Sequence, residues 1–94
     1  MPPSQLPEAE IASRLNSLHS WRREGDEITR TFEFANFRAA LAFVNKTGDL
    51  AESAGHHPDI DIRYNRVRLA LVTHDAGGLT ELDFRLAANA DGVA

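Results

Sequence analysis

The chain has 94 residues, of which 43% are hydrophobic and 26% are charged, and it contains no cysteine. This length and composition predict one soluble domain, spanning 1–94, with one modest hydrophobic core. The net charge of −4 argues against direct binding of nucleic acid, and the lack of cysteine excludes disulfides and thiol chemistry.

No apolar run approaches the roughly 20 residues needed to cross a bilayer. The first residues also lack a basic segment leading into an apolar one, so we expect neither a membrane span nor a signal peptide. A chain without cysteine fits a reducing compartment, and we expect a cytoplasmic protein. Because a domain of this size buries little apolar surface, self-association would not be surprising.

The first predicted element is a helix over 7–18, in which Pro7 suits the first turn. Its apolar side chains recur at helical spacing: Ile11, Leu15 and Leu18. A β-hairpin follows, with a short strand over 19–24, a turn at Gly25-Asp26 and an alternating strand over 27–34.

A second helix is predicted between Asn36, whose side chain can cap it, and Gly55, a natural stop. Apolar or small residues follow along it at helical spacing: Phe37, Leu41, Val44, Gly48 and Ala51.

The second hairpin follows Pro58. Its first strand alternates three apolar residues, Ile60, Ile62 and Tyr64, with three charged ones, Asp59, Asp61 and Arg63. The turn is predicted at Asn65-Arg66, and the return strand also alternates: Val67, Leu69 and Leu71.

A last helix is predicted over 81–90. Thr80 and Asp83 resemble a capping box at its start, and Leu79 and Phe84 have the spacing of a hydrophobic staple.

The element order is therefore α-β-β-α-β-β-α. Hairpins join the strands, which predicts antiparallel pairing. We predict an α+β fold, a two-layer sandwich of one four-stranded antiparallel sheet with three helices on one face. The opposite sheet face or an edge strand could then serve for self-association.

Three of the four histidines fall within nineteen residues: His56, His57 and His74. Histidine has an unperturbed pKa of about 6.5, so it can exchange a proton near neutrality. Pro58 restrains the preceding residue to extended backbone, where successive side chains point in different directions. Pairing across the second hairpin places residues 72–74 opposite His57 and Pro58. The sequence therefore predicts a site for proton transfer at one rim of the sheet.

These residues also have structural interpretations. A lone histidine near a turn is more often structural than catalytic. Glu52 could be an exposed helical carboxylate or a partner that raises histidine basicity. The structural role of Asp83 would be that of a helix cap, and Tyr64 would be a half-buried strand residue. Trp21 fits the core, although an aromatic side chain at the rim could also stack on a flat ligand.

The main alternative to a proton-transfer site is a metal site, because Glu52, His56 and His74 could supply three ligands. Gly55 interrupts that helical turn, so we favour a site without metal. No serine or cysteine nucleophile is indicated. Three arginines cluster near the turn of the second hairpin: Arg63, Arg66 and Arg68. We favour a solvated strand face over an anion-binding site for them.

The spacing of seven residues resembles the signature of the pterin-4a-carbinolamine dehydratases: Glu52-x3-His56-His57-Pro58-x5-Tyr64-x9-His74-x8-Asp83. Trp21, the pair Thr73-His74 and the segment 78–83 are also similar to that family. The resemblance covers nearly the whole chain.

The resemblance implies a four-stranded antiparallel sheet with helices on one face, a homodimer or homotetramer, and no metal or organic cofactor. The implied activity is that of a hydro-lyase, 4a-hydroxytetrahydrobiopterin dehydratase, in the recycling of a pterin cofactor. The reaction removes water from 4a-hydroxytetrahydropterin and gives quinonoid dihydropterin. It needs an acid that protonates the leaving oxygen and a base that takes a proton from the ring nitrogen system.

Carried over to this chain, the resemblance makes His56 and His74 the acid–base pair. His57 would bind and orient the pterin, Glu52 would polarise His56, and Asp83 would position His74 or cap its helix. Three more residues are expected to support the substrate site: Trp21, Pro58 and Tyr64.

Two positions depart from the family pattern: Gly55 stands where many relatives have an acidic residue, and Leu82 where many have an arginine.

A second class of function stays open, that of a binding or assembly protein. Relatives act as a dimerisation cofactor for a homeodomain transcription factor, and others are linked to enzyme assembly or molybdopterin metabolism. Retention of all three histidines favours the enzyme.

Overall fold

The computed structural model describes residues 3–94, so the first two residues of the predicted domain lie outside the described part. Its elements follow the predicted order: α1 (Glu8–Asn16), β1 (Arg22–Glu24), β2 (Glu27–Glu33), α2 (Phe37–Ala54), β3 (Asp59–Arg63), β4 (Arg66–Leu71), a short 3₁₀ helix (His74–Ala76) and α3 (Glu81–Val93).

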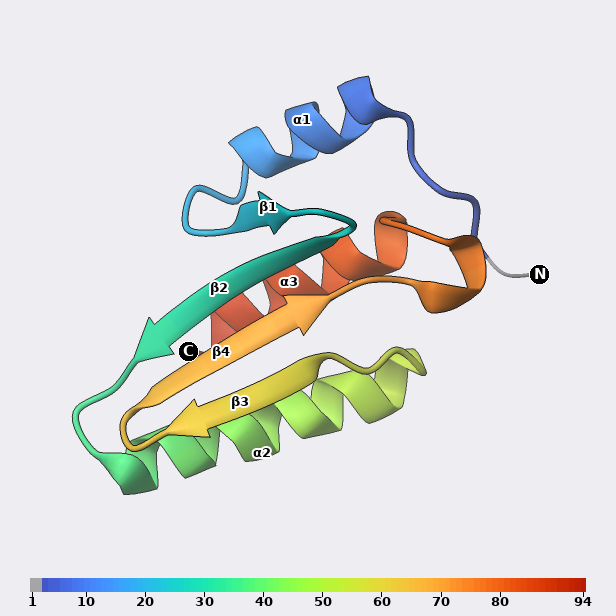
Figure 1. The fold of residues 1–94 in the computed structure, drawn as a ribbon. Coiled ribbons are helices and arrows are strands. Elements are labelled where there is room, and N and C mark those ends of the chain that lie inside the picture. Colours follow the sequence, from blue (N-terminus) through green and yellow to red (C-terminus); the bar gives the residue numbers. More distant parts are fainter. Residues whose placement is uncertain (1–2) are drawn as a thin grey trace.

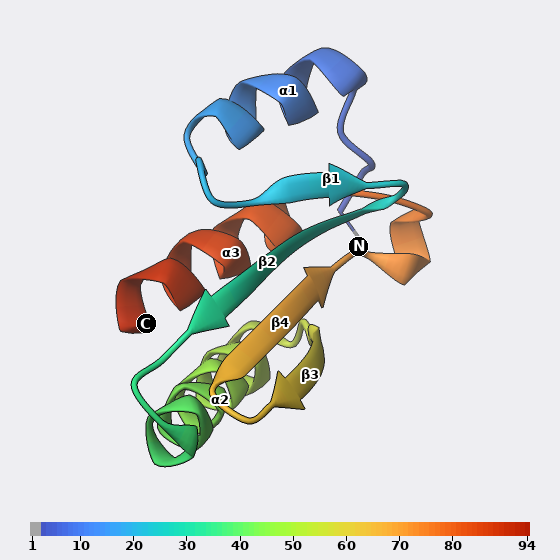
Figure 2. The same cartoon turned by 60° about the vertical axis from the view of Figure 1, so that its left-hand side comes forward.

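The four strands form one open antiparallel sheet in the order β1-β2-β4-β3, which confirms the predicted fold class. Figures 1 and 2 show α2 and α3 covering one face of the sheet, with α1 alongside the β1 edge. Ile11 of α1 is only 1% exposed and joins the same core. Within residues 3–94, no helix has the length and apolar character needed to span a membrane.

The core lies between the sheet and the helices. Phe32 of β2 packs against Phe43 of α2 with ring centroids 4.5 Å apart, and Phe34 lies 5.0 Å from the same ring. The strands contribute further buried side chains that alternate along the chain: Ile28, Val67, Leu69 and Leu71. This alternation is the reason that the hairpins were visible in the sequence.

Both ends of α2 are as predicted. The Asn36 side chain accepts a hydrogen bond from the backbone N–H of Ala39 at 2.8 Å. Gly55 has a left-handed φ of 63°, and the N–H groups of Gly55 and His56 return to the carbonyls of Glu52 and Ala51. These two bonds form a Schellman motif, which fixes the direction in which the chain leaves the helix.

The buried face of α2 is offset from the predicted stripe. The side chains that face the core are Ala40, Phe43, Thr47 and Ala51. Phe37 and Leu41 are instead 46% and 39% exposed. Small residues let α2 approach the sheet closely, and alanine carries too weak a hydrophobic signal to mark the core face in advance.

The turn of the second hairpin was predicted one residue too late. Arg63 pairs with Arg66, so the two-residue turn is Tyr64-Asn65. Asn65 fixes this position because its side-chain amide donates to the Phe34 carbonyl at 2.8 Å. Tyr64 takes a positive φ of 52° and is 67% exposed, so the prediction of a half-buried strand residue was wrong.

His74 lies in a loop beyond the end of β4, whereas the predicted hairpin extended its strand pairing as far as residues 72–74. β4 ends at Leu71, and His74 begins the 3₁₀ helix that Gly77 closes with a φ of 75°. Thr73 and Gly78 pair through two backbone hydrogen bonds of 3.2 and 3.3 Å, which close this loop on itself. His74 is therefore presented on a tight loop at the end of the sheet.

The two glycines of the α2 segment should respond in opposite ways to alanine. Gly55→Ala forces a side chain into a left-handed conformation and should cost about 1 kcal/mol of folding free energy. Gly48→Ala, inside the helix and with open space around the added Cβ, should gain up to about 1 kcal/mol. Chemical denaturation of both variants measures the difference, and a Gly55→Ala variant as stable as Gly48→Ala would contradict this account of the cap.

Candidate active site

A fully buried carboxylate, Asp83, organises one end of the sheet. Its Oδ2 accepts hydrogen bonds from the Thr73 hydroxyl at 2.8 Å and from the Thr80 backbone N–H at 2.9 Å. Its Oδ1 lies 2.6 Å from Nε2 of His56. Thr80 and Asp83 form the predicted capping box. The same aspartate thus starts α3 and joins the loop after β4 to the loop after α2.

The ring of His56 is fixed by this contact. A carboxylate can only accept, so Nε2 carries the proton and Nδ1 of the neutral ring is left as an acceptor. The side chain is 10% exposed. Nδ1 makes no hydrogen bond within residues 3–94, and these residues do not enclose it completely. His56 therefore offers a ring nitrogen to solvent while Asp83 holds the opposite side.

His57 has a different partner. Its Nε2 lies 2.5 Å from Oε2 of Glu52, and the two side chains are 62% and 77% exposed. The resemblance assigned Glu52 to His56, but the structure places it against His57. Gly55 is the reason, because its left-handed turn brings the fifth residue after Glu52, rather than the fourth, back over the last turn of α2.

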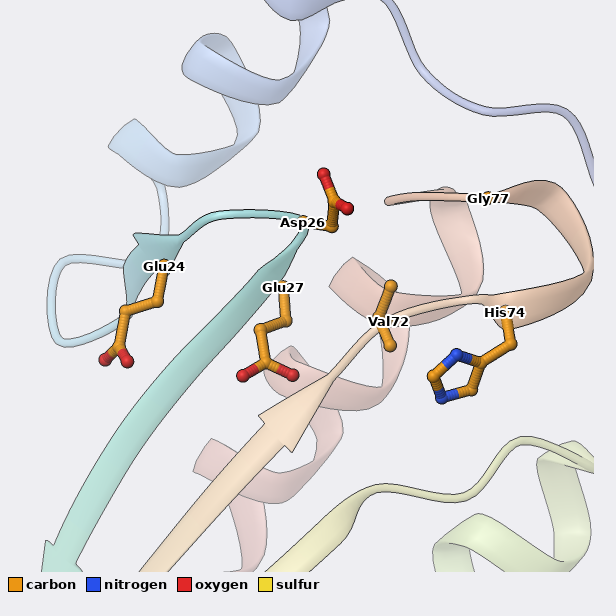
Figure 3. Close-up of a pocket in the computed structure, with 6 residues that line it drawn as sticks. All are labelled: Glu24, Asp26, Glu27, Val72, His74 and Gly77. Carbon is orange, nitrogen blue, oxygen red and sulfur yellow. The ribbon is translucent and has the colours of Figure 1, made fainter.

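His74 lines an open cleft of about 320 Å³ between the β1–β2 turn and the loop after β4. The cleft is lined by Glu24, Asp26, Glu27, Val72, His74 and Gly77 (Figure 3). In Figure 3 the side chains of His74 and Glu27 project from neighbouring segments toward the same side of the sheet. A hydrogen bond from Thr29, assisted by the charge of Arg68, lowers the pKa of Glu24 below its usual value. The cleft thus combines an imidazole with carboxylates.

No sequence pattern indicates that these acidic residues belong to the site. They lie about fifty positions before His74, and only the pairing of β2 with β4 brings the two segments together. A short acidic turn such as Glu24-Gly25-Asp26-Glu27 is otherwise typical of any exposed hairpin.

The three histidines lie at the same end of the sheet. His56 is linked through Asp83 to Thr73, the residue that precedes His74. Figure 1 shows the loop between α2 and β3 beside the loop between β4 and α3. His57 precedes Pro58, which leads directly into β3. The fold thus brings together the two histidine segments that the hairpin pattern predicted to be neighbours.

Two other candidate residues lie elsewhere. Trp21 is 5% exposed, packs edge-to-face on Phe32 at 6.1 Å and donates its indole N–H to Asp91 at 2.9 Å. It belongs to the core and does not line the cleft of His74. Tyr64 lies at the far end of β3, in the turn.

The three possible metal ligands do not form one site. Glu52 contacts His57, His56 contacts Asp83, and His74 lines the cleft. Among residues 3–94, no group of three or more histidine, aspartate or glutamate side chains is arranged to hold a metal ion.

Close relatives share nearly the whole chain. A protein of Chloroflexus aurantiacus, provisionally named a pterin-4-alpha-carbinolamine dehydratase, is 65% identical over 95% of this chain and 96% of its own. A protein of Acidobacterium capsulatum with the same provisional name is 62% identical over 96% of this chain and 98% of its own.

Two solved structures are also similar. One is described as a transcriptional coactivator/pterin dehydratase from Brucella melitensis, with a TM-score of 0.93, 35% identity and coverage of 97% of this chain and 99% of that one. The other is a pterin dehydratase-like protein described as a RuBisCO assembly factor in the alpha-carboxysome. Its TM-score is 0.69 and its identity 29%, over 81% of this chain and 90% of that one.

The family model described as pterin 4 alpha carbinolamine dehydratase matches residues 4–93. With that match, and with relatives more than 60% identical over almost their full length, the chain belongs to the pterin 4 alpha carbinolamine dehydratase family.

Proposed function

We propose that this protein removes water from a 4a-hydroxytetrahydropterin and releases quinonoid dihydropterin. The observation that carries the proposal is the contact of His56 with the buried carboxylate of Asp83. It lies at the end of the sheet where β3 begins and β4 ends, next to His57 and His74 in the chain. Family membership supplies the substrate class. The cleft at His74, about 320 Å³, has the size of a small-molecule site.

His56 and His74 form the acid–base pair of this mechanism. Nδ1 of His56 takes the proton from the ring nitrogen, and Asp83 stabilises the imidazolium that forms, as a buried aspartate does beside other histidine bases. His74 donates a proton to the 4a-hydroxyl, the C4a–O bond breaks, and the oxygen leaves as water. General acid–base catalysis of this kind supplies about 10²–10⁴-fold in rate.

The remaining residues bind and orient the substrate. His57 is exposed and contacts Glu52, so its ring is available to contact a bound pterin. Glu27 lies in the cleft with His74, and its carboxylate can accept hydrogen bonds from the N–H groups of the pterin ring. Pro58 restrains the backbone of His57 to an extended conformation.

A second candidate is a binding or assembly role, because one similar structure is described as an assembly factor and another as a transcriptional coactivator. Turnover by the isolated chain separates the two. An enzyme at substoichiometric concentration accelerates the decay of freshly generated 4a-hydroxytetrahydropterin without any partner protein. A folded chain that leaves the decay at its background rate would favour the assembly role.

A further inference from the structure

Two buried hydroxyl groups lie behind the contact between Asp83 and His56. Thr80 is fully buried and Thr73 is 5% exposed, and their Oγ atoms are 2.8 Å apart. Oγ of Thr73 is also 2.8 Å from Oδ2 of Asp83. Thr73 belongs to the loop after β4, whereas Thr80 is the cap of α3, so the fold brings the two hydroxyls together.

The direction of each hydrogen bond between these groups is determined by the carboxylate. Asp83 can only accept, so Thr73 uses its one hydroxyl proton on Oδ2. Oγ of Thr73 must then accept from Thr80, and Oγ of Thr80 accepts from the backbone N–H of Leu82 at 3.2 Å. These bonds form a hydroxyl relay in which every proton points toward the carboxylate: Leu82 N–H, Thr80 Oγ, Thr73 Oγ and Asp83 Oδ2.

The relay engages one oxygen of Asp83 and leaves the other to the histidine. Oδ2 accepts from Thr73 and from the Thr80 backbone N–H, whereas Oδ1 is 2.6 Å from Nε2 of His56. The last torsion of an aspartate side chain has a broad energy minimum, so a carboxylate that is bonded on one side only can turn. Donors from two separate segments fix its plane, and with it the ring of His56.

The cap of α3 does not need the Thr73 hydroxyl. Thr80 and Asp83 alone make the capping box. The additional bonds of Thr73 connect that box to the residue directly before His74. The relay therefore joins the segments that carry both members of the proposed acid–base pair to one carboxylate, which a helix cap alone would not require.

We propose that Thr80 and Thr73 are positioning residues for dehydration, whose hydroxyl groups fix Asp83 and, through it, the tautomer and ring orientation of His56. Both hydroxyls are buried and direct their protons into the relay, so they act through His56 and not on the substrate. The effect on turnover rests on the proposed dehydratase function, whereas the fixed ring of His56 can be measured without substrate.

Steady-state kinetics of two isosteric variants test the effect on turnover. Thr80→Val and Thr73→Val each remove one hydroxyl and keep the shape of the side chain. Each should lower kcat by about 10-fold, a loss typical of removing a hydrogen bond that orients a functional histidine. KM should stay within about two-fold, because neither side chain binds substrate. Thr80→Ser retains the hydroxyl and should recover most of the wild-type kcat.

The hydroxyls act in series, so their effects should not add. The double variant Thr73→Val/Thr80→Val should lose no more of kcat than the more impaired single variant. Thr73→Val also leaves the Thr80 cap of α3 in place, so it tests the relay even if Thr80→Val is too unstable to purify. Losses that multiply in the double variant would contradict a single relay.

Asn36→Ala is the matched control for the loss of a helix cap. Asn36 accepts from the backbone N–H of Ala39 at the start of α2, as Thr80 does from Leu82 in α3, but its side chain is exposed and takes no part in the relay. Asn36→Ala should lower the midpoint of thermal unfolding and leave kcat unchanged. Equal losses of kcat in Asn36→Ala and Thr80→Val would overturn the proposal, because any loss of a cap would then lower turnover.

Proton NMR of the imidazole gives a measurement that is independent of turnover. The Nε2 proton of His56 contacts Asp83 and the side chain is 10% exposed, so the wild type should show a separate downfield resonance that His56→Ala lacks. The resonance should broaden or disappear in Thr80→Val and Thr73→Val and persist in Asn36→Ala. This pattern in a wild type without turnover would support the relay and contradict only the dehydratase function. An unchanged resonance in both valine variants, or an unchanged kcat in an active enzyme, would overturn the proposal.

Discussion

Replacing His74 with alanine is expected to lower the turnover number for dehydration by about 10²-fold or more. His74 is exposed on a short 3₁₀ helix, and its side chain makes no hydrogen bond within residues 3–94. Its loss therefore removes the proposed acid without leaving a buried group unpaired. The midpoint of thermal unfolding should stay within a few degrees of the wild type, because exposed substitutions usually change stability by less than about 0.5 kcal/mol.

His19→Ala is the matched control, since His19 is also exposed and does not line the cleft. It should leave turnover unchanged. Steady-state rates for both variants, with unfolding curves recorded on the same preparations, give the comparison. If His74→Ala turns over as fast as His19→Ala, the acid is a different group.

Replacing Asp83 with alanine should destabilise the protein by about 3 kcal/mol, the scale of a broken buried network. The carboxylate is fully buried and accepts from Thr73, from the N–H of Thr80 and from His56. Its removal leaves the Thr80 N–H and His56 without this acceptor and deletes the Asp83 half of the capping box of α3, although the Thr80 side chain remains. For a domain of this size each kcal/mol shifts the unfolding midpoint by roughly 4–8 °C, so a fall of about 12 °C or more is expected.

Asp75→Ala, on the exposed loop beside this network, is the control and should change the midpoint little. Asp83→Asn separates stability from catalysis. Its amide oxygen can still accept from Thr73 and Thr80, but its NH₂ group would face Nε2 of His56 and impose the other tautomer. It should keep most of the stability and lose most of the turnover. An Asp83→Asn variant with normal turnover would show that the ring orientation of His56 does not matter to the reaction.

Local patterns were sufficient to predict most of the fold. The alternation in β2, β3 and β4 and the caps at Asn36 and Thr80 are short-range signals, and each corresponds to an observed element. The predictions are wrong where a tertiary contact determines the local backbone conformation. The hydrogen bond from the Asn65 side chain to the carbonyl of Phe34, thirty-one residues away, sets the position of the turn. No local sequence pattern predicts that contact.

The sequence predicts the location of the histidines but not the residues that contact them. The spacing of His56, His57 and His74 pointed to one rim, and the pairing of β3 with β4 brings the segments that carry them to one end of the sheet. Their partners were not predictable, because the left-handed turn at Gly55 decides that Glu52 meets His57. The carboxylates near His74 depend on the pairing of β2 with β4, which is a long-range contact.

The most direct test of the account is the first-order decay of freshly generated 4a-hydroxytetrahydropterin, followed in parallel without protein, with the wild type and with folded His56→Ala. We expect a wild-type rate well above background and a His56→Ala rate lower by about 10²-fold or more. A wild-type rate equal to background would contradict the dehydratase function, and a His56→Ala rate equal to that of the wild type would contradict the role of the Asp83–His56 pair.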